Sequence, residues 1–294
     1  TGSARLDLYR RGGDSLMGRY HAWRLHPFTL AEIIGSAPQH ALVPFKELPF
    51  AYTATPSSRS LFESLHTFGG FPEPLFAQNI KTLRRWQNER LDRMIREDIR
   101  DIESVRDLSA LQVLVELLPN KVSSPLSLNA LREDLQVAHK TITLWIDILE
   151  RFYYHFRVYP FASTLIKSLR RQPKIYLWDW SQIEKEGARF ENIIASHLLK
   201  LVHFLHDSEG YKAELFYLRD VDGHEVDFLV TVNRKPWFAV EAKQSDTDLH
   251  APLLYFGRKL KIPYLYQVTE KRGIDTLKEG VRVMSAEKFL TGLI

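Results

Sequence analysis

The chain has 294 residues with a formal net charge of +4, and 45% of its residues are hydrophobic, which favours two or three packed domains and argues against disorder. It contains no cysteine, which excludes disulfide frameworks, thiolate zinc sites and cysteine nucleophiles and is compatible with a cytoplasmic location. No apolar run approaches the roughly 18 residues of a membrane span, whereas the mild positive charge permits a nucleic-acid partner.

The N-terminal third is expected to be mainly helical. Thr1 is not preceded by an initiating methionine, and we interpret the chain as a fragment that begins inside a fold. A helix-like piece covers Ala4 to Arg11, and HAWRL at 21–25 has the apolar content of a short strand. Thr29, three residues before Glu32, predicts a capping box at a helix start. Beyond a proline-rich loop region, residues 74–106 predict a long helical segment whose interleaved charges indicate a solvated face.

Three short helices follow, in SALQVLVELLPNKV, LSLNALREDLQV and HKTITLWIDILERFYY. Ser127 is the predicted N-cap of the second, and the third places an apolar stripe on one face, consisting of Ile142, Ile146, Leu149 and Phe152. This spacing is typical of a helix-turn-helix, and the aromatic tail FYYHFRVYPF can supply a wing. We therefore predict a winged helix at residues 105–162.

Candidate DNA contacts lie in and just after this unit. Lys140, Thr141 and Thr143 are on the predicted outward face of the third helix, and a basic run follows at Lys167, Arg170, Arg171 and Lys174. Two alternatives stay open, because winged helices also contact proteins and a basic run of this kind is commonly a solvated loop.

The remaining residues alternate strand and helix patterns. Strands are predicted at KIYLWDW, AELFYLRD, HEVDFLV, WFAVEAK, PYLYQVT and VRVMS, with helices near 183–206 and 253–260 and a short closing helix capped by Ser285. This order predicts a mixed α/β fold with helices on both faces of a mixed sheet.

The most informative stretch is the predicted hairpin at 225–243. Alternation places Glu225 and Asp227 on one face of the first strand, and Glu241 and Lys243 on one face of the second. If these faces coincide, carboxylates and an ammonium converge in an apolar setting. Because isolated buried charges are costly, such a cluster either binds a cation or pairs internally.

Asp227 followed by Glu241-Ala242-Lys243 resembles the motif of the PD-(D/E)xK nuclease superfamily. Glu191, in FENIIASHL, matches the acidic helix position of its Holliday-junction-resolvase-like branch. The resemblance implies that Asp227, Glu241 and Glu191 hold Mg²⁺ or Mn²⁺, and that Asp227, Glu241 and Lys243 are catalytic. The alternative is a vestigial site in which Lys243 neutralises the acids.

Nearly the whole chain is similar to the C-terminal part of a prokaryotic AAA-type ATPase family. The matching stretches are TGS, SLMGRY, LHPFTLAE, GGFPEP, LPNKVSSPLS, YLRD, EVDFLV and VEAK. The resemblance implies an ATPase remnant at 1–35, a helical lid at 36–104, the winged helix at 105–162 and a restriction-endonuclease-like domain at 163–294. It also makes Ser3 and Arg19 remnants of a nucleotide site. Because no G-x-x-x-x-G-K-[ST] loop is present, ATP binding is expected only with an additional N-terminal part.

Two functions follow as hypotheses. In the first, the chain is the DNA-acting part of an ATPase, with a winged helix that delivers duplex to a Mg²⁺-dependent nuclease-like site. In the second, it is a non-catalytic module that binds DNA or protein through a vestigial nuclease fold. DNA is the expected partner under the first hypothesis. No membrane partner is expected, and the formation of a homo-oligomer is left open. His203 and His206, three apart on a predicted helix, are more simply a surface pair than metal ligands.

Overall fold

The computed structural model describes residues 21, 23–36, 42–50, 55–100, 105, 107–162, 168–169, 171–245 and 248–294. Several sequence-based expectations lie outside these ranges. They are the helix at Ala4 to Arg11, the SLMGRY stretch, the nucleotide-site remnants Ser3 and Arg19, and two of the basic residues, Lys167 and Arg170.

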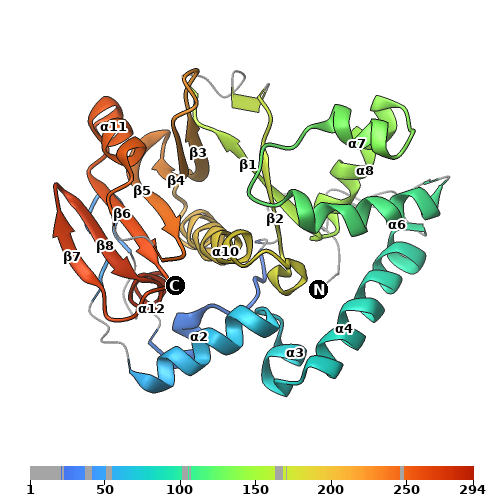
Figure 1. Ribbon diagram of the computed structural model, residues 1–294, viewed down its shortest axis with the longest axis horizontal. Helices are drawn as coiled ribbons and strands as arrows, with labels where there is room; N and C mark the ends of the chain where they lie inside the picture. The colour runs from blue at the N-terminus through green and yellow to red at the C-terminus, as the bar shows by residue number, and fades with distance from the viewer. Residues whose placement is uncertain are drawn as a thin grey trace.

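One mixed sheet of eight strands, in the order β2-β1-β3-β4-β5-β6-β8-β7, organises the described residues (Figure 1). The strands are β1 (His155–Pro160), β2 (Lys174–Leu177), β3 (Ala213–Arg219), β4 (Glu225–Val232), β5 (Lys235–Lys243), β6 (Tyr264–Thr269), β7 (Asp275–Lys278) and β8 (Val281–Ser285). The sheet is antiparallel from β3 to β5 and parallel through β5, β6 and β8. The predicted mixed α/β class is confirmed. Strand β7 was not predicted, because its four residues are all exposed and carry no apolar alternation.

Helices cover both faces of the sheet, as predicted. On one side, α10 (Glu186–Asp207) packs Ile193, Ile194 and Leu198 into a core shared with Phe228 and Val240. On the other side, α11 (Ala251–Leu260) packs Leu253 and Phe256 into a core with Leu229, Ala239 and Val283. Alternate residues of the central strands therefore point to opposite cores. The closing helix α12 (Ala286–Thr291) starts after Ser285 as predicted, but the Ser285 side chain makes no capping hydrogen bond.

The hairpin predicted at the centre is formed by β4 and β5. Its turn consists of Asn233 and Arg234, since Val232 already pairs with Lys235, and both turn residues have positive φ, +50° and +61°. Two consecutive left-handed residues give the twist that a tight hairpin requires.

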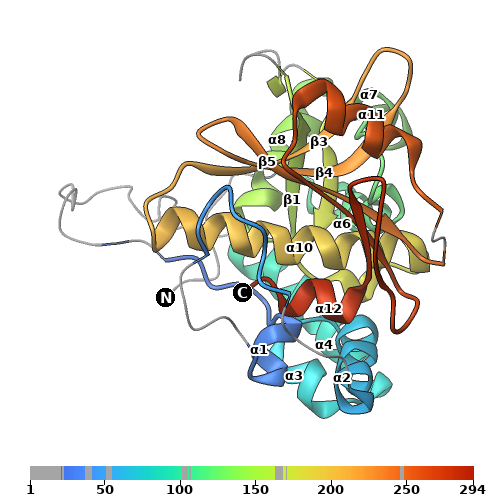
Figure 2. The same ribbon diagram turned by 90° about the vertical axis from the view of Figure 1, so that its left-hand side faces the viewer.

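A layer of helices from the N-terminal third lies below α10 and α12 (Figure 2). It comprises α1 (Leu30–Ile34), α2 (Pro56–Phe68), α3 (Pro72–Ala77), α4 (Ile80–Arg93) and the π-helical η2 (Met94–Ile99). The Thr29–Glu32 capping box at α1 is confirmed. The predicted charge-laced segment corresponds to α4 and η2, where Arg85, Glu89 and Arg93 are exposed and pair along the helix.

Gly69 and Gly70, between α2 and α3, permit a close approach of three segments. A Cβ at Gly70 would lie 2.6 Å from Trp180 and 2.8 Å from the Phe28 carbonyl oxygen, which only glycine tolerates. The Gly70 carbonyl accepts from Phe28 N at 2.7 Å, and Trp180 Nε1 donates to the Leu65 carbonyl at 2.8 Å. These contacts hold residues 27–28 against the helical layer.

The strand predicted at HAWRL is wrong, since none of the described residues 21 and 23–25 is in a strand. Arg24 donates to Asp207 with its Nε at 2.9 Å, and His26 Nε2 lies 2.9 Å from His203 Nδ1. Side-chain contacts with α10 thus hold this segment in place of backbone pairing with a neighbouring strand.

The three predicted helices before the sheet are confirmed as α6 (Leu108–Leu117), α7 (Leu128–Asp134) and α8 (His139–Arg151). Ser127 caps α7 by accepting from Ala130 N at 3.2 Å, and the apolar stripe of α8 is at least 96% buried. The following strand β1 pairs antiparallel with β2, and Pro125, between α6 and α7, forms a bridge with Lys174. Strand β1 also continues into the large sheet through Tyr159 and Pro160, which pair with β3.

The side chain of Asn192 joins α10 to strand β2, which lies at one edge of the sheet. The fully buried Asn192 accepts from Leu177 N at 2.7 Å and donates to the Leu177 carbonyl at 2.8 Å. The amide thus replaces the backbone partner that an edge strand lacks on one side. It fixes the spacing between β2 and the helix that carries Glu191.

Asn192→Leu should therefore destabilise the fold by about 1–3 kcal/mol, because it leaves a buried N–H and a buried carbonyl without partners. Chemical denaturation followed by circular dichroism measures the loss. Ser196→Ala is the matched control, since it removes only the 3.2 Å contact from the Asn192 amide. Equal losses in the two variants would contradict this role for Asn192.

Candidate functional site

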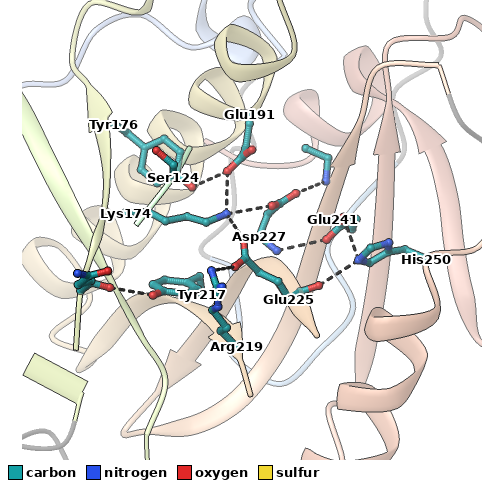
Figure 3. Close-up of polar contacts among 12 residues, drawn as sticks. Ser124, Lys174, Tyr176, Glu191, Tyr217, Arg219, Glu225, Asp227, Glu241 and His250 are labelled. Atoms are coloured by element: carbon teal, nitrogen blue, oxygen red, sulfur yellow. Dashed lines mark hydrogen bonds and ion pairs between the residues drawn. The ribbon is translucent and has the colours of Figure 1, made fainter. Parts of the chain in front are cut away.

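The structure brings Asp227 and Glu241 together on neighbouring strands, as the predicted hairpin required. Both side chains are buried, and the backbone N–H of Asp227 donates to Glu241 Oε2 at 3.3 Å. The backbone N–H of Ala242 donates to Asp227 Oδ2 at 3.0 Å. Register, with Phe228 opposite Val240, puts the two carboxylates on the same face (Figure 3). The two strands thus hold two acidic side chains close together in a largely dry setting.

A cation from a distant strand lies beside these carboxylates. Lys174 of β2, whose side chain is 1% exposed, directs its Nζ at Glu225 Oε1 (2.7 Å), Asp227 Oδ1 (3.3 Å) and Glu191 Oε1 (3.3 Å) (Figure 3). Although burial disfavours the charged ammonium, these three carboxylates raise the pKa of Lys174. Lys174 is therefore a permanently charged group among three acids.

Glu191 reaches the cluster from α10, in agreement with its predicted position on a helix that precedes the two strands. Besides Lys174, it accepts a hydrogen bond from Tyr176 Oη at 2.7 Å. Burial and the nearby Asp227 carboxylate raise the pKa of Glu191 to about 7, in spite of the opposing effect of Lys174. Lys174 and Tyr176, two residues apart on β2, both contact this carboxylate.

Glu225 and His250 complete the cluster on its open side. Glu225 pairs with Lys174 and with Arg219, whose guanidinium lies at 3.0 Å. His250 Nε2 lies 3.2 Å from Glu241 Oε1 and 3.0 Å from the Glu225 carbonyl oxygen. Because a carbonyl oxygen can only accept, His250 Nε2 carries a hydrogen and donates it. Glu225 therefore contacts the central ammonium directly.

Lys243, the predicted catalytic lysine, pairs with Glu241 Oε1 at 2.7 Å. This is the neutralising contact that the vestigial-site alternative describes. Burial and the Asp227 carboxylate nevertheless raise the pKa of Glu241 to about 8, against the effect of Lys243. Burial and the Asp227 carboxylate thus outweigh the effect of Lys243 on the pKa of Glu241.

As arranged, these residues do not fit a divalent ion. The carboxylate oxygens are hard ligands of the type that Mg²⁺ and Mn²⁺ prefer. However, Lys174 Nζ lies among three of them, and Asp227, Glu241 and Glu191 are not within metal-ligand spacing of one another. Among the described residues, one trio has that spacing, namely Asp220, Asp222 and His224. Its Asp220 carboxylate is already engaged by the backbone N–H groups of Asp222 and His224.

Besides Lys174, four of the predicted DNA contacts lie among the described residues. Lys140 is exposed at the start of α8, whereas Thr141 and Thr143 are half-buried, and the Thr143 hydroxyl donates to the His139 carbonyl. Arg171 is exposed in the segment before β2. Arg171 and His139 both line a cavity of about 310 Å³ between α7, α8, β1, Leu169 and residues 171–173.

Sequence analysis missed Lys174 as a site residue, because it was grouped with the basic run that precedes it. The available signal was the strand pattern of KIYL, which gives Lys174 and Tyr176 the same side-chain direction. No signal in the sequence identified His250. Its role depends on the contact between the start of α11 and β4, which only the fold creates.

The histidines His203 and His206 do not act together. His203 contacts His26, whereas His206 Nδ1 lies 3.0 Å from Asp207 Oδ1, which also accepts from Arg24. Burial lowers the pKa of His26 to about 2, so this ring is neutral. The two histidines are therefore part of the packing of residues 24–26 on α10.

Two family models match parts of the chain. Residues 186–289 match a domain of unknown function (DUF4143), which is often found at the C-terminus of AAA-ATPase-like proteins. Residues 59–183 match a second domain of unknown function (DUF8612). The searches of curated proteins and of solved structures each gave no significant match. No helix in the described ranges is both long and apolar enough to cross a membrane.

The raised pKa of Glu241 predicts how stability changes with pH. Between its ordinary pKa of 4.5 and about 8, the folded protein keeps a proton that the unfolded chain releases, so stability falls as pH rises through this window. Glu241→Gln should reduce that slope between pH 7 and 8 by up to about 1.4 kcal/mol per pH unit, the limit for one proton.

Urea denaturation at several pH values measures this slope. Glu279→Gln, at an exposed turn residue, is the matched control and should leave the slope unchanged. A Glu241→Gln protein with the wild-type slope over the same window would show that Glu241 does not retain a proton there.

Proposed function

We propose that this chain binds duplex DNA through the unit formed by α6, α7, α8, β1 and β2, and that its nuclease-like centre is neutralised internally. The observation that carries the DNA-binding part is the order of these elements. Three helices followed by an antiparallel strand pair, with a bridge from Pro125 to the second strand, is the arrangement expected of a winged helix. In that arrangement α8 is the recognition helix.

The charges near the start of α8 support phosphate contact. Lys140 is exposed there, and Arg171 lies on the cavity wall that also includes His139, at the start of α8. Asp147, one of the acids on α8, pairs with Arg157 at 2.8 Å, which offsets its repulsion of phosphate. Lysine and arginine side chains of this kind supply the sequence-independent part of DNA affinity.

The internal neutralisation rests on Lys174. Its ammonium occupies the centre of Glu191, Glu225 and Asp227, and Lys243 pairs with Glu241. Buried acids paired in this way are stable without an added cation. The match of residues 186–289 to a domain often found beside AAA-type ATPases supports a role as the DNA-contacting part of such an ATPase.

Fluorescence anisotropy with a labelled duplex tests the DNA-binding proposal. The wild-type protein should bind with an affinity that falls as salt rises, and Lys140→Ala and Arg171→Ala should each lower the slope of log affinity against log salt by about 1. Lys261→Ala is the control. This exposed lysine directly follows α11, and α11 lies at the other end of the sheet from α8 (Figure 1).

Binding that is insensitive to salt, or equal losses in all three variants, would count against the proposal. If this chain binds no duplex even at low salt, the three-helix unit would instead be a site for a protein partner, which is the alternative function of winged helices.

A metal-dependent nuclease is the second candidate function. It is favoured by Asp227 on β4, Glu241 and Lys243 on β5 and Glu191 on α10, whose order in the sequence resembles the PD-(D/E)xK motif. In this function Mg²⁺ or Mn²⁺ would supply charge neutralisation at a phosphate, and the chain would supply the carboxylates that hold it.

Plasmid incubation with Mg²⁺ or Mn²⁺ separates the two functions. With the centre neutralised by Lys174, we expect the supercoiled DNA to stay intact. Scission that depends on the divalent ion and falls by about 100-fold or more in Asp227→Asn and Lys243→Ala would establish the nuclease instead. Scission that persists in both variants would indicate a contaminating enzyme, which repurification of the Asp227→Asn protein checks.

A further inference from the structure

The cavity beside α8 has the size of a small-molecule site. It has a volume of about 310 Å³ and lies between α7, α8, β1 and the residues that lead into β2. The elements around it lie together at one end of the sheet (Figure 1). Ligand cavities in proteins begin at about 300 Å³, and they combine a mainly apolar lining with a few convergent polar groups. This cavity is therefore large enough for a compact ligand, such as a substituted aromatic ring.

The buried part of the lining is apolar. Leu126 and Ile146 are 3% and 1% exposed, and the half-buried Leu128 and Tyr159 add an aliphatic side chain and an aromatic ring. Alternation along β1 directs Tyr159 to the same face as Arg157, which also lines the cavity. An apolar group of a ligand would leave water on contact with these side chains, which favours its binding.

The charges of the lining favour an anion. None of the described residues that line the cavity is acidic, whereas Arg157 and Arg171 are cationic. Arg157 is neutralised by Asp147, at 2.8 Å, and by Glu150. The Arg171 guanidinium, in contrast, makes no ion pair or hydrogen bond with any residue that the structure describes. Arg171 thus gives the cavity a positive charge that no carboxylate of the described ranges neutralises.

Two neutral groups of the lining are also without a hydrogen-bond partner among the described residues. They are the side-chain amide of Gln172 and the hydroxyl of Tyr159. Both can donate a hydrogen bond, and Arg171 has five N–H donors in a planar fork. This fork matches the oxygens of an ionised carboxylate or phosphate group in a bidentate manner. The polar lining is therefore suited to an anionic group of a ligand.

We infer that this cavity binds a small organic anion, with a carboxylate or phosphate group on Arg171 and Gln172 and an apolar body against Leu126 and Ile146. Such binding requires neither DNA nor the acidic centre around Lys174. It is a further function of the three-helix unit, in addition to the proposed contact with duplex DNA.

Proton and phosphorus NMR titrations of the whole chain test this inference. The probes are phenyl phosphate and benzoate, whereas phenol and inorganic phosphate each supply only one half of the ligand. The wild type should bind phenyl phosphate or benzoate at least about ten-fold more tightly than either half, because only a whole ligand uses both parts of the lining. The tighter of the two aromatic anions identifies the preferred anionic group.

Arg171→Gln removes the charge of an exposed side chain. It should lower the affinity for the tighter aromatic anion by about ten-fold or more and change the affinity for phenol little, because a hydrogen bond to a charged group is lost. Lys140→Gln is the matched control and should retain the wild-type affinity. It removes an exposed charge at the start of α8 from a residue that does not line the cavity.

Leu128→Trp is a second kind of variant, because the larger side chain fills the cavity. It should weaken the binding of phenol and of the aromatic anions alike, and circular dichroism checks that the protein is folded. A folded Leu128→Trp protein with wild-type affinities would place the ligand outside the cavity and overturn the inference.

Three other results would also overturn it. In the first, neither phenyl phosphate nor benzoate binds. In the second, the aromatic anions bind no more tightly than inorganic phosphate, so the apolar lining contributes nothing. In the third, Arg171→Gln and Lys140→Gln lower the affinity equally, as expected of attraction to surface charge alone. Because these titrations contain no DNA, a failure of the DNA-binding proposal would leave them unaffected and would be seen separately by anisotropy.

Discussion

The structure depends on the neutralisation of buried carboxylates at the junction of α10, β2 and β4. Asp227 and Glu241 are 9% and 4% exposed, and charges at that depth are tolerated only with partners. Lys174 reaches Asp227 from β2, whereas Lys243 pairs with Glu241 within β5. The ion pairs of Lys174 therefore connect parts of the fold that the backbone ladders connect only weakly.

The continuity of the sheet determines what this cluster can do. Strand β1 pairs with β2 on one side and, through Tyr159 and Pro160, with β3 on the other. The three-helix unit and the α/β unit consequently share one sheet and are not joined by a loose linker. Lys174 and Asn192 add side-chain contacts across the same junction, so the state of the acidic centre and the position of β2 are linked by direct contacts.

Local pattern was enough to predict most elements, because each depends on residues close in sequence. The Thr29–Glu32 capping box, the Ser127 cap and the buried stripe of α8 are set by side chains within one or two helical turns. The pattern failed at HAWRL, where contacts of Arg24 and His26 with α10 replace strand pairing. It also failed at β7, a strand without an apolar face. At HAWRL a neighbour distant in sequence decides the conformation, whereas β7 forms by pairing with β8, the next strand in the chain.

The sequence by itself determined that Glu225 and Asp227 share one face of a strand and that Glu241 and Lys243 share one face of the next, because side chains alternate along a strand. The register of β4 with β5 decided that the two faces coincide. The sequence also determined that an acidic helix residue, Glu191, precedes them. Only the tertiary structure decided which cation faces which acid. Lys174 is 53 residues from Asp227 in the chain, and a contact at that separation depends on the packing of β2 against α10, which no local pattern encodes.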